Sequence, residues 1–254
     1  MSLRNSVTHY SYRKLWIRGG YPRSFLARGN QESLDWRKNY ISTFLERDIP
    51  NLGISIPAET LRRFWMMLSH CHGQTLNYSE LGRSFGIADT TVRRYLDILS
   101  GTFMVRNLTP WFENISKRQV RSPKLYFRDT GILHWFYGTS TYEELSAHPK
   151  LGASWEGFAL EEVIKHYEAT PEEAYFWATQ SNAELDLLLL KDGRRLGFEM
   201  KYTSSPKVTR SMQIALNDLK LDALTVIVPG SSSYPLTEKI RAVGLEGLTQ
   251  QALS

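Results

Sequence analysis

The chain has 254 residues, a formal net charge of +5, and a composition that is 42% hydrophobic and 12% aromatic. This length accommodates one large domain or two to three small ones, and the composition excludes a disordered protein. We expect neither a membrane span nor a secretory leader, because no apolar run of about 18 residues occurs. Cys71 is the only cysteine, which excludes internal disulfides and cysteine-based zinc sites and favours a cytoplasmic protein.

Charge is distributed unevenly along the chain. Residues 1–50 carry nine Lys or Arg against four acidic residues, and residues 51–128 carry eleven against five. Residues 129–254 carry eleven against seventeen. A basic front half predicts an anionic partner, with nucleic acid first. The alternative is an ordinary solvated surface.

The amino-terminal region contains WIRGGYP at 16–22 and a predicted helix over 31–50 that ends in LERDIP. Pro50 is expected to stop this helix. Its apolar residues recur at helical spacing: Leu34, Tyr40, Ile41, Phe44 and Leu45. These segments resemble the lid end of a prokaryotic AAA+-type ATPase family. In that family a nucleotide-binding domain precedes a winged helix and a carboxy-terminal domain of unknown function, and the resemblance extends from about Leu15 onwards.

The phosphate-binding motif G-x-x-x-x-G-K-[ST] is absent from all 254 residues. We therefore expect no ATP binding or hydrolysis by this chain alone. The resemblance implies the carboxy-terminal part of such an ATPase, with an ATPase domain as partner in cis or in trans. It also implies that Arg18 reaches a nucleotide held by that domain. The alternative is that Arg18 caps a helix or pairs with a surface acid.

Residues 58–71 predict a helix whose apolar stripe is core. Next to it, His70, Cys71 and His72 form a triplet, which we interpret as structural because no further ligands lie nearby in the sequence.

Residues 77–99 predict a helix-turn-helix. Asn77 or Ser79 is expected to cap the first helix, Gly86 to allow the turn, and Asp89 to cap the second helix. The polar residues near the start of the second helix then face outwards, where a recognition helix contacts DNA: Thr90, Thr91, Arg93 and Arg94.

Residues 102–109 and 124–127 predict the two strands of a wing, joined by a basic loop. Its candidate DNA-binding residues are Lys117, Arg118 and Arg121. This pattern is typical of a winged helix. Winged helices also serve as protein-docking modules, and that alternative stays open.

Two helical segments follow. Residues 128–149 predict a connector in which Asp129 caps a helix. Residues 152–168 predict a helix with Glu156 on its apolar face, a costly place for an acid unless it is paired.

A hairpin over 184–201 carries charged residues on one face. Asp192-Gly193 predicts a two-residue turn that pairs Lys191 with Arg194. The same register places Asp186 opposite Glu199, with Cβ atoms roughly 4.5–5.5 Å apart. Two carboxylates at that distance repel, and a divalent cation such as Mg²⁺ or Mn²⁺ would explain their pairing.

Asp186 followed by Glu199-Met200-Lys201 resembles the PD-(D/E)xK nuclease core, although Leu185 stands where the motif's name has proline. The resemblance implies metal ligands at Asp186 and Glu199, and Lys201 assisting the attacking water. It also implies a glutamate from the first helix, for which we choose Glu156, with Glu162 second. Gln213 is a further candidate. The alternative is a solvated face with a Glu184–Lys201 pair.

Residues 174–179, 207–219 and 223–228 complete the core as strand, helix and buried strand. We predict a mixed α+β chain with a lid-like helical segment at 1–50 and a winged helix at 51–128. A connector at 129–150 and a restriction-endonuclease-like α/β domain at 151–254 follow. The predicted function is DNA binding with a metal-dependent nuclease domain. The alternative is a non-catalytic DNA- or protein-binding regulatory module of an AAA+ ATPase. The sequence predicts no particular oligomeric state.

Overall fold

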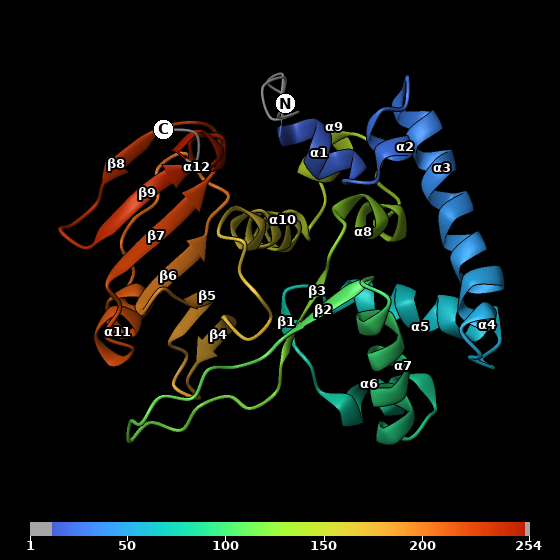
Figure 1. Ribbon diagram of the computed structural model, residues 1–254, viewed down its shortest axis with the longest axis horizontal. Helices are drawn as coiled ribbons and strands as arrows, with labels where there is room; N and C mark the ends of the chain where they lie inside the picture. The colour runs from blue at the N-terminus through green and yellow to red at the C-terminus, as the bar shows by residue number, and fades with distance from the viewer. Residues whose placement is uncertain (1–11, 252–254) are drawn as a thin grey trace. The chain divides into compact units, whose positions relative to one another are not determined.

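The computed structural model describes residues 12–251, which divide into two compact units (Figure 1). Unit 1 comprises the described residues up to His70 together with 129–151, and unit 2 comprises 71–128 together with the described residues from Gly152 onwards. The predicted mixed α+β class is confirmed. These units cut across the predicted segments, because the helix-turn-helix belongs to the same unit as the carboxy-terminal sheet.

Unit 1 is helical. Its helices are α1 (Tyr12–Arg18), α2 (Pro22–Phe25), α3 (Asn30–Thr43), η2 (Phe44–Asp48), α4 (Ile49–Asn51), α5 (Ala58–His70), α8 (Thr130–Tyr137) and α9 (Tyr142–Ser146). The helix predicted over 31–50 runs without a break through α3, the π-helical turn η2 and α4, and it ends at Asn51, one residue after Pro50.

Asp129 joins two parts of unit 1. Its side chain caps α8 by accepting a hydrogen bond from Ile132 N at 2.9 Å, which confirms its predicted capping role. The other carboxylate oxygen accepts a bond from Gly20 N at 2.7 Å. The WIRGGYP segment is thereby tied to the start of α8.

The helix-turn-helix of unit 2 consists of α6 (Tyr78–Phe85) and α7 (Asp89–Gly101). Asn77 caps α6 by accepting a bond from Glu80 N, and Gly86 takes a left-handed φ of 71°, both as predicted. The prediction that Asp89 caps α7 is wrong: Ala88 is the cap residue, and Asp89 instead accepts a bond from Ser79 Oγ at 2.7 Å.

Three short strands accompany this motif in the order β1-β3-β2: β1 (Gln74–Thr75), β2 (Val105–Leu108) and β3 (Lys124–Phe127). The predicted pairing of the two wing strands is confirmed. Their connection, however, runs along strand β4 (Figure 1). Trp111 N donates to Phe176 O at 2.7 Å, and Val120 N donates to Ala178 O at 2.9 Å. The connection covers the edge of the large sheet, where unpaired backbone groups would otherwise face water.

The large sheet has the order β4-β5-β6-β7-β9-β8. Its strands are β4 (Ala174–Ala178), β5 (Glu184–Lys191), β6 (Arg194–Met200), β7 (Ala223–Val228), β8 (Ser233–Pro235) and β9 (Ile240–Gly244). Strands β4, β5 and β6 are antiparallel neighbours, whereas β6, β7 and β9 are parallel. Helix α10 (Leu151–His166) precedes the sheet, α11 (Arg210–Asp218) connects β6 to β7, and α12 (Leu245–Gln251) follows β9.

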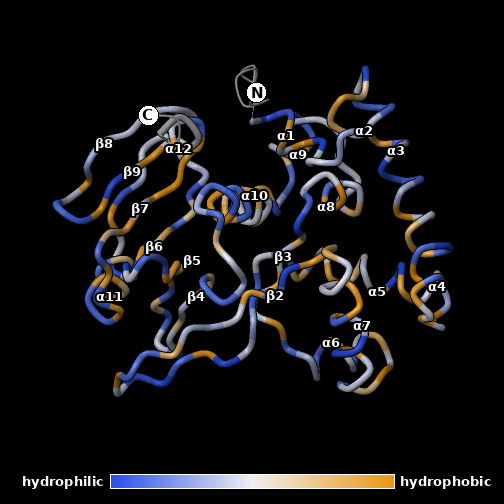
Figure 2. The backbone as a smooth tube through the Cα atoms, in the orientation of Figure 1, coloured by the Kyte–Doolittle hydropathy of each residue, from blue (hydrophilic) through white to orange (hydrophobic). Residues whose placement is uncertain are grey.

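The predicted order of helix, three strands, helix and strand is confirmed over 151–228. Helix α11 begins later than predicted because Thr209 caps it, accepting a bond from Met212 N at 3.2 Å. A hydrophobic core lies between the sheet and α11, and it includes Leu185, Leu188, Met212, Leu224 and Val226. Figure 2 shows hydrophobic residues along β7 and β9. Among residues 12–251, no helix combines the length and apolarity needed to cross a bilayer.

Candidate functional site

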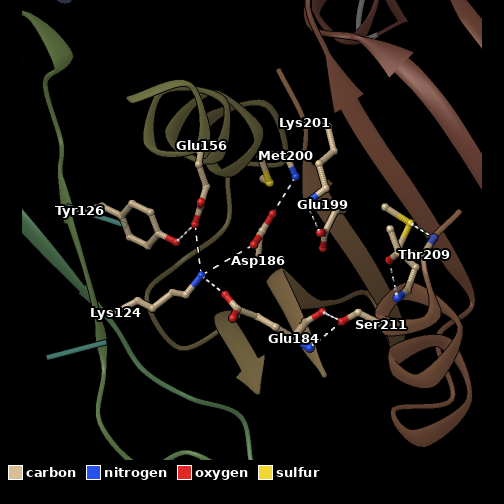
Figure 3. Close-up of polar contacts among 11 residues, drawn as sticks. Lys124, Tyr126, Glu156, Glu184, Asp186, Glu199, Met200, Lys201, Thr209 and Ser211 are labelled. Carbon is tan, nitrogen blue, oxygen red and sulfur yellow. Dashed lines mark hydrogen bonds and ion pairs between the residues drawn. The ribbon is translucent and has the colours of Figure 1, made fainter. Parts of the chain in front are cut away.

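The β5–β6 hairpin turns at the predicted residues. Asp192 and Gly193 both have positive φ, 52° and 72°, and Lys191 pairs with Arg194. The same register continues to Leu187 opposite Phe198. Asp186 Oδ2 then accepts a bond from Met200 N at 2.8 Å, beside Glu199 (Figure 3). Both carboxylates are buried, with Asp186 7% and Glu199 6% exposed.

The two oxygens of Glu199 have different surroundings. Oε1 forms an ion pair with Lys201 Nζ at 2.7 Å. Oε2 is buried and has no hydrogen-bond partner among the described residues. Burial first, and then the charge of Asp186, raises the pKa of Glu199 to about 8. A buried carboxylate oxygen without a donor favours protonation or a cation.

Glu156 approaches the same cluster from helix α10. Burial and the charge of Asp186 raise its pKa to about 7. Its Oε1 accepts a hydrogen bond from the Tyr126 hydroxyl at 2.6 Å and lies 3.2 Å from Lys124 Nζ. The choice of Glu156 from its place on an apolar helix face therefore agrees with its position near Asp186.

Lys124 was not predicted to belong to this site. Its ammonium group lies among three carboxylates: it forms ion pairs with Glu156 and Glu184 and is 3.7 Å from Asp186 Oδ1 (Figure 3). Burial opposes the charge, but the surrounding acidic groups raise the pKa of Lys124 well above its usual range. Lys124 and Tyr126 share one face of β3 because strand side chains alternate. A lysine embedded in the apolar strand sequence KLYF was the available signal.

The other candidates on this domain lie elsewhere. Glu162 pairs with Lys165 at 2.7 Å. Gln213 is exposed, and Ser211 of the same helix instead exchanges hydrogen bonds with the backbone of Glu184. The alternative Glu184–Lys201 pair does not form, because each of these residues has a different ion-pair partner.

The candidate DNA-binding residues divide into two groups. On α7, Thr90, Arg93 and Arg94 are exposed and Thr91 is half-buried. Arg93 lies over the ring of Tyr78, with 3.8 Å from its guanidinium carbon to the ring centroid.

The loop residues belong to the segment that lies along β4. Lys117, Arg118 and Arg121 are exposed. Lys117 Nζ pairs with Asp218 at 2.6 Å, and the carbonyl oxygen of Arg118 accepts a bond from Gln180 N at 2.9 Å. The basic loop predicted to join the wing strands is therefore attached to the large sheet.

Arg18, in unit 1, uses its guanidinium locally. It donates to the Ala27 carbonyl at 2.6 Å and to Asn30 Oδ1 at 2.9 and 3.1 Å. This position agrees with a structural role in the loop after α2. Among residues 12–251, no group of three or more His, Cys, Asp or Glu side chains is arranged to hold a metal ion. The His70-Cys71-His72 triplet therefore forms no such group.

Two family models match the chain. Residues 9–143 match "Domain of unknown function (DUF8612)", and residues 151–248 match "Domain of unknown function (DUF4143)". The second domain is commonly a carboxy-terminal domain associated with AAA-type ATPases, which agrees with the resemblance noted from the sequence.

The chain is 53% identical over 230 residues to "Uncharacterized protein Mb2031c" of Mycobacterium bovis and, equally, to "Uncharacterized protein Rv2008c" of Mycobacterium tuberculosis. Each match covers 91% of this chain and 52% of the relative, so the chain spans about half the length of these curated relatives. No solved structure matches the chain significantly.

Proposed function

The chain belongs to the family described as "Domain of unknown function (DUF8612)", whose model covers more than half of it, and we propose that its unit 2 cleaves phosphodiesters of nucleic acid with a divalent cation. One observation carries this proposal: Oε2 of Glu199 is buried without a hydrogen-bond partner among the described residues, in a carboxylate whose pKa is raised by burial and by the charge of Asp186. Carboxylate oxygens are the ligands that Mg²⁺ and Mn²⁺ prefer.

No three His, Cys, Asp or Glu side chains form a metal site among the described residues, so the proposed cation would have two carboxylate ligands and otherwise be hydrated. Asp186 Oδ1 and Glu199 Oε2 supply two carboxylate oxygens, while Met200 N and Lys201 hold their other oxygens. Water molecules complete the coordination of Mg²⁺ in most protein sites. When bound, the ion would polarise the phosphoryl group and lower the pKa of a bound water.

Lys201 is open to solvent at this site, with its side chain 42% exposed. Its ammonium group orients Glu199 and can donate a hydrogen bond to a phosphate oxygen. Glu156 supports the cluster from α10, and its raised pKa allows it to hold a proton near neutral pH.

The helix-turn-helix supplies the nucleic-acid contact in this proposal. Arg93, Arg94 and Thr90 are exposed on α7, and Thr91 lies beside them. Cations at such positions neutralise phosphates, and affinity then depends steeply on salt. The basic loop, with Lys117, Arg118 and Arg121, adds charge along the sheet edge.

A second candidate function is a non-catalytic, regulatory module of an AAA-type ATPase. It is favoured by the ammonium of Lys124, which already neutralises the carboxylates. Under both functions an ATPase domain is a partner in cis or in trans, and we expect no ATP hydrolysis by these 254 residues alone, because they contain no phosphate-binding loop.

The test is cleavage of plasmid and single-stranded DNA with Mg²⁺ or Mn²⁺. Asp186→Asn keeps an acceptor for Met200 N but removes a ligand charge. We expect cleavage to fall by at least about 100-fold, since outer-shell partners alone account for about 10- to 100-fold. Lys201→Ala should also reduce it.

Asp192→Asn is the matched control, because Asp192 is exposed in the turn of the same hairpin and asparagine tolerates its positive φ. Equal cleavage by wild type and Asp186→Asn would refute the assignment. A wild type that is inactive on both substrates and binds no Mn²⁺ would support the regulatory module.

A further inference from the structure

A lysine lies beside one of the two oxygens that the proposed function assigns to a cation, with its Nζ 3.7 Å from Asp186 Oδ1. Lys124 is 4% exposed, and its ammonium group contacts the carboxylates of Glu156, Glu184 and Asp186. These residues come from three elements that are distant in sequence, β3, α10 and β5. The ammonium is therefore enclosed by the carboxylate cluster, as Figure 3 shows.

Strand pairing and hydrogen bonds of neighbouring residues fix the position of Lys124. Strand β3 is the middle strand of its sheet, paired with both β1 and β2. Two residues along the same face, the Tyr126 hydroxyl donates to Glu156. The loop before β3 is tied to β4 through Val120 N and through Gln119, whose side-chain oxygen accepts a bond from Trp177 Nε1 at 2.9 Å. The side chain thus enters the cluster from a well-anchored strand.

The remaining acceptor has no contact with this ammonium among the ion pairs of the described residues. Lys124 contacts Oδ1 of Asp186, the same oxygen that the proposed function leaves for a cation, whereas Oε2 of Glu199 has no partner among the described residues. An ammonium and a divalent cation repel strongly at a few ångströms in a poorly solvated site. The ammonium of Lys124 and a divalent cation therefore compete for Asp186 Oδ1, and each weakens the binding of the other.

We propose that Lys124 is an internal competitor for the divalent cation, so that the carboxylate site is self-inhibited while this side chain lies in it. This inference rests on the proposed function and adds a residue that inhibits metal binding at the same site. It assigns the β2–β3 hairpin a role beyond its place in the helix-turn-helix domain: the hairpin carries the residue that opposes metal binding.

The test compares Mn²⁺ binding by wild type and Lys124→Met, followed by calorimetry and by the electron paramagnetic resonance of free Mn²⁺. Methionine keeps an unbranched stem but removes the charge. We expect Lys124→Met to bind Mn²⁺ at least tenfold more tightly than wild type, and Lys124→Met combined with Asp186→Asn to lose this gain.

Lys165→Met is the matched control, since it removes one ammonium from an exposed ion pair with Glu162 on α10. Its Mn²⁺ affinity should equal that of wild type. If Lys124→Met does not fold, as judged by circular dichroism, Lys124→Gln makes the same comparison with a neutral side chain that still donates hydrogen bonds to Glu156.

The outcomes separate the two proposals. Equal Mn²⁺ affinity in wild type and the Lys124 variant overturns the competitor, while DNA cleavage by wild type would leave the proposed function standing. Tighter Mn²⁺ binding without cleavage by either protein supports the competitor and overturns the nuclease. Absence of Mn²⁺ binding in both proteins overturns both.

Discussion

Each unit of this protein buries a cationic side chain, and the two side chains have different partners: uncharged carbonyl oxygens in unit 1 and carboxylates in unit 2. In unit 1, Arg37 is fully buried and donates to the carbonyl oxygens of Ser33, Ile17 and Gly131 at 2.8 to 3.3 Å. In unit 2, Lys124 is surrounded by carboxylates. Burial lowers the pKa of Arg37 to about 10, whereas acidic neighbours raise the pKa of Lys124 despite burial.

The difference separates a structural cation from one that can be exchanged. Carbonyl oxygens carry no net charge, and a guanidinium with several N–H groups can donate to three of them from one place. Carboxylates carry a full charge, so another cation can take the position of the lysine. Unit 1 therefore uses its buried charge to join α1, α3 and α8, and unit 2 holds its buried charge at the site of the proposed chemistry.

The largest expected effect is on the structural cation. Arg37→Met should lower the free energy of unfolding by roughly 2–4 kcal/mol, because it removes three buried hydrogen bonds that join α1, α3 and α8. Urea denaturation would measure this loss. Lys38→Met, at the exposed neighbouring position on α3, is the control and should change the value by less than about 0.5 kcal/mol.

An unchanged stability of Arg37→Met would contradict the structural role assigned to Arg37. A stable Arg37→Met protein would mean that the carbonyl oxygens find other donors. Mn²⁺ binding should be unchanged in this variant, since Arg37 belongs to unit 1 and the carboxylates belong to unit 2.

The exposed arginines of α7 are expected to bind DNA phosphates. Changing Arg93 and Arg94 together to alanine should weaken binding to duplex DNA and reduce the slope of log K against log salt by about 0.9 for each phosphate that the variant no longer neutralises. Fluorescence anisotropy between about 50 and 200 mM salt would measure it. Exchange of Arg63, which is exposed on α5 outside the helix-turn-helix, for alanine is the comparison.

A duplex affinity that is the same in the double variant and wild type would contradict the DNA-binding role of α7. The helix-turn-helix would then be better interpreted as a docking module.

A further expected effect concerns the pH dependence of stability. The pKa of Glu199 is raised to about 8, so between about pH 5 and 8 the folded protein retains a proton that the unfolded chain has lost. Stability therefore falls as pH rises through this window. Glu199→Gln removes this linkage, and its Tm relative to wild type should rise steadily with pH across the same window in EDTA.

Exchange of the exposed Glu238 for glutamine serves as the control and should give a Tm difference that is constant with pH. A Glu199→Gln difference that is also constant would show that this carboxyl titrates normally in the folded protein.

Local features of the site could be predicted because neighbouring residues determine them. Asp192-Gly193 adopts its turn through two residues that tolerate positive φ, and the pairing that this turn sets continues to Leu187 opposite Phe198. Asn77, Gly86 and Asp129 likewise form a cap, a turn and a cap within four residues of their own positions, although Asp129 also binds the distant Gly20 N. The sequence by itself determined these caps, this turn and the order of elements over 151–228.

Only the tertiary structure decided which charges meet. Lys124 lies 62 positions before Asp186 in the sequence, and no local periodicity links them. Their ion pair depends on how β3, α10 and β5 pack within unit 2. The same applies to the loop along β4, because an edge strand is completed by whichever segment the fold brings to it. Which cation neutralises a buried carboxylate depends on packing between segments that are distant in sequence. The sequence therefore indicated Asp186 and Glu199, whereas only the packed unit brought Lys124 to the carboxylate cluster.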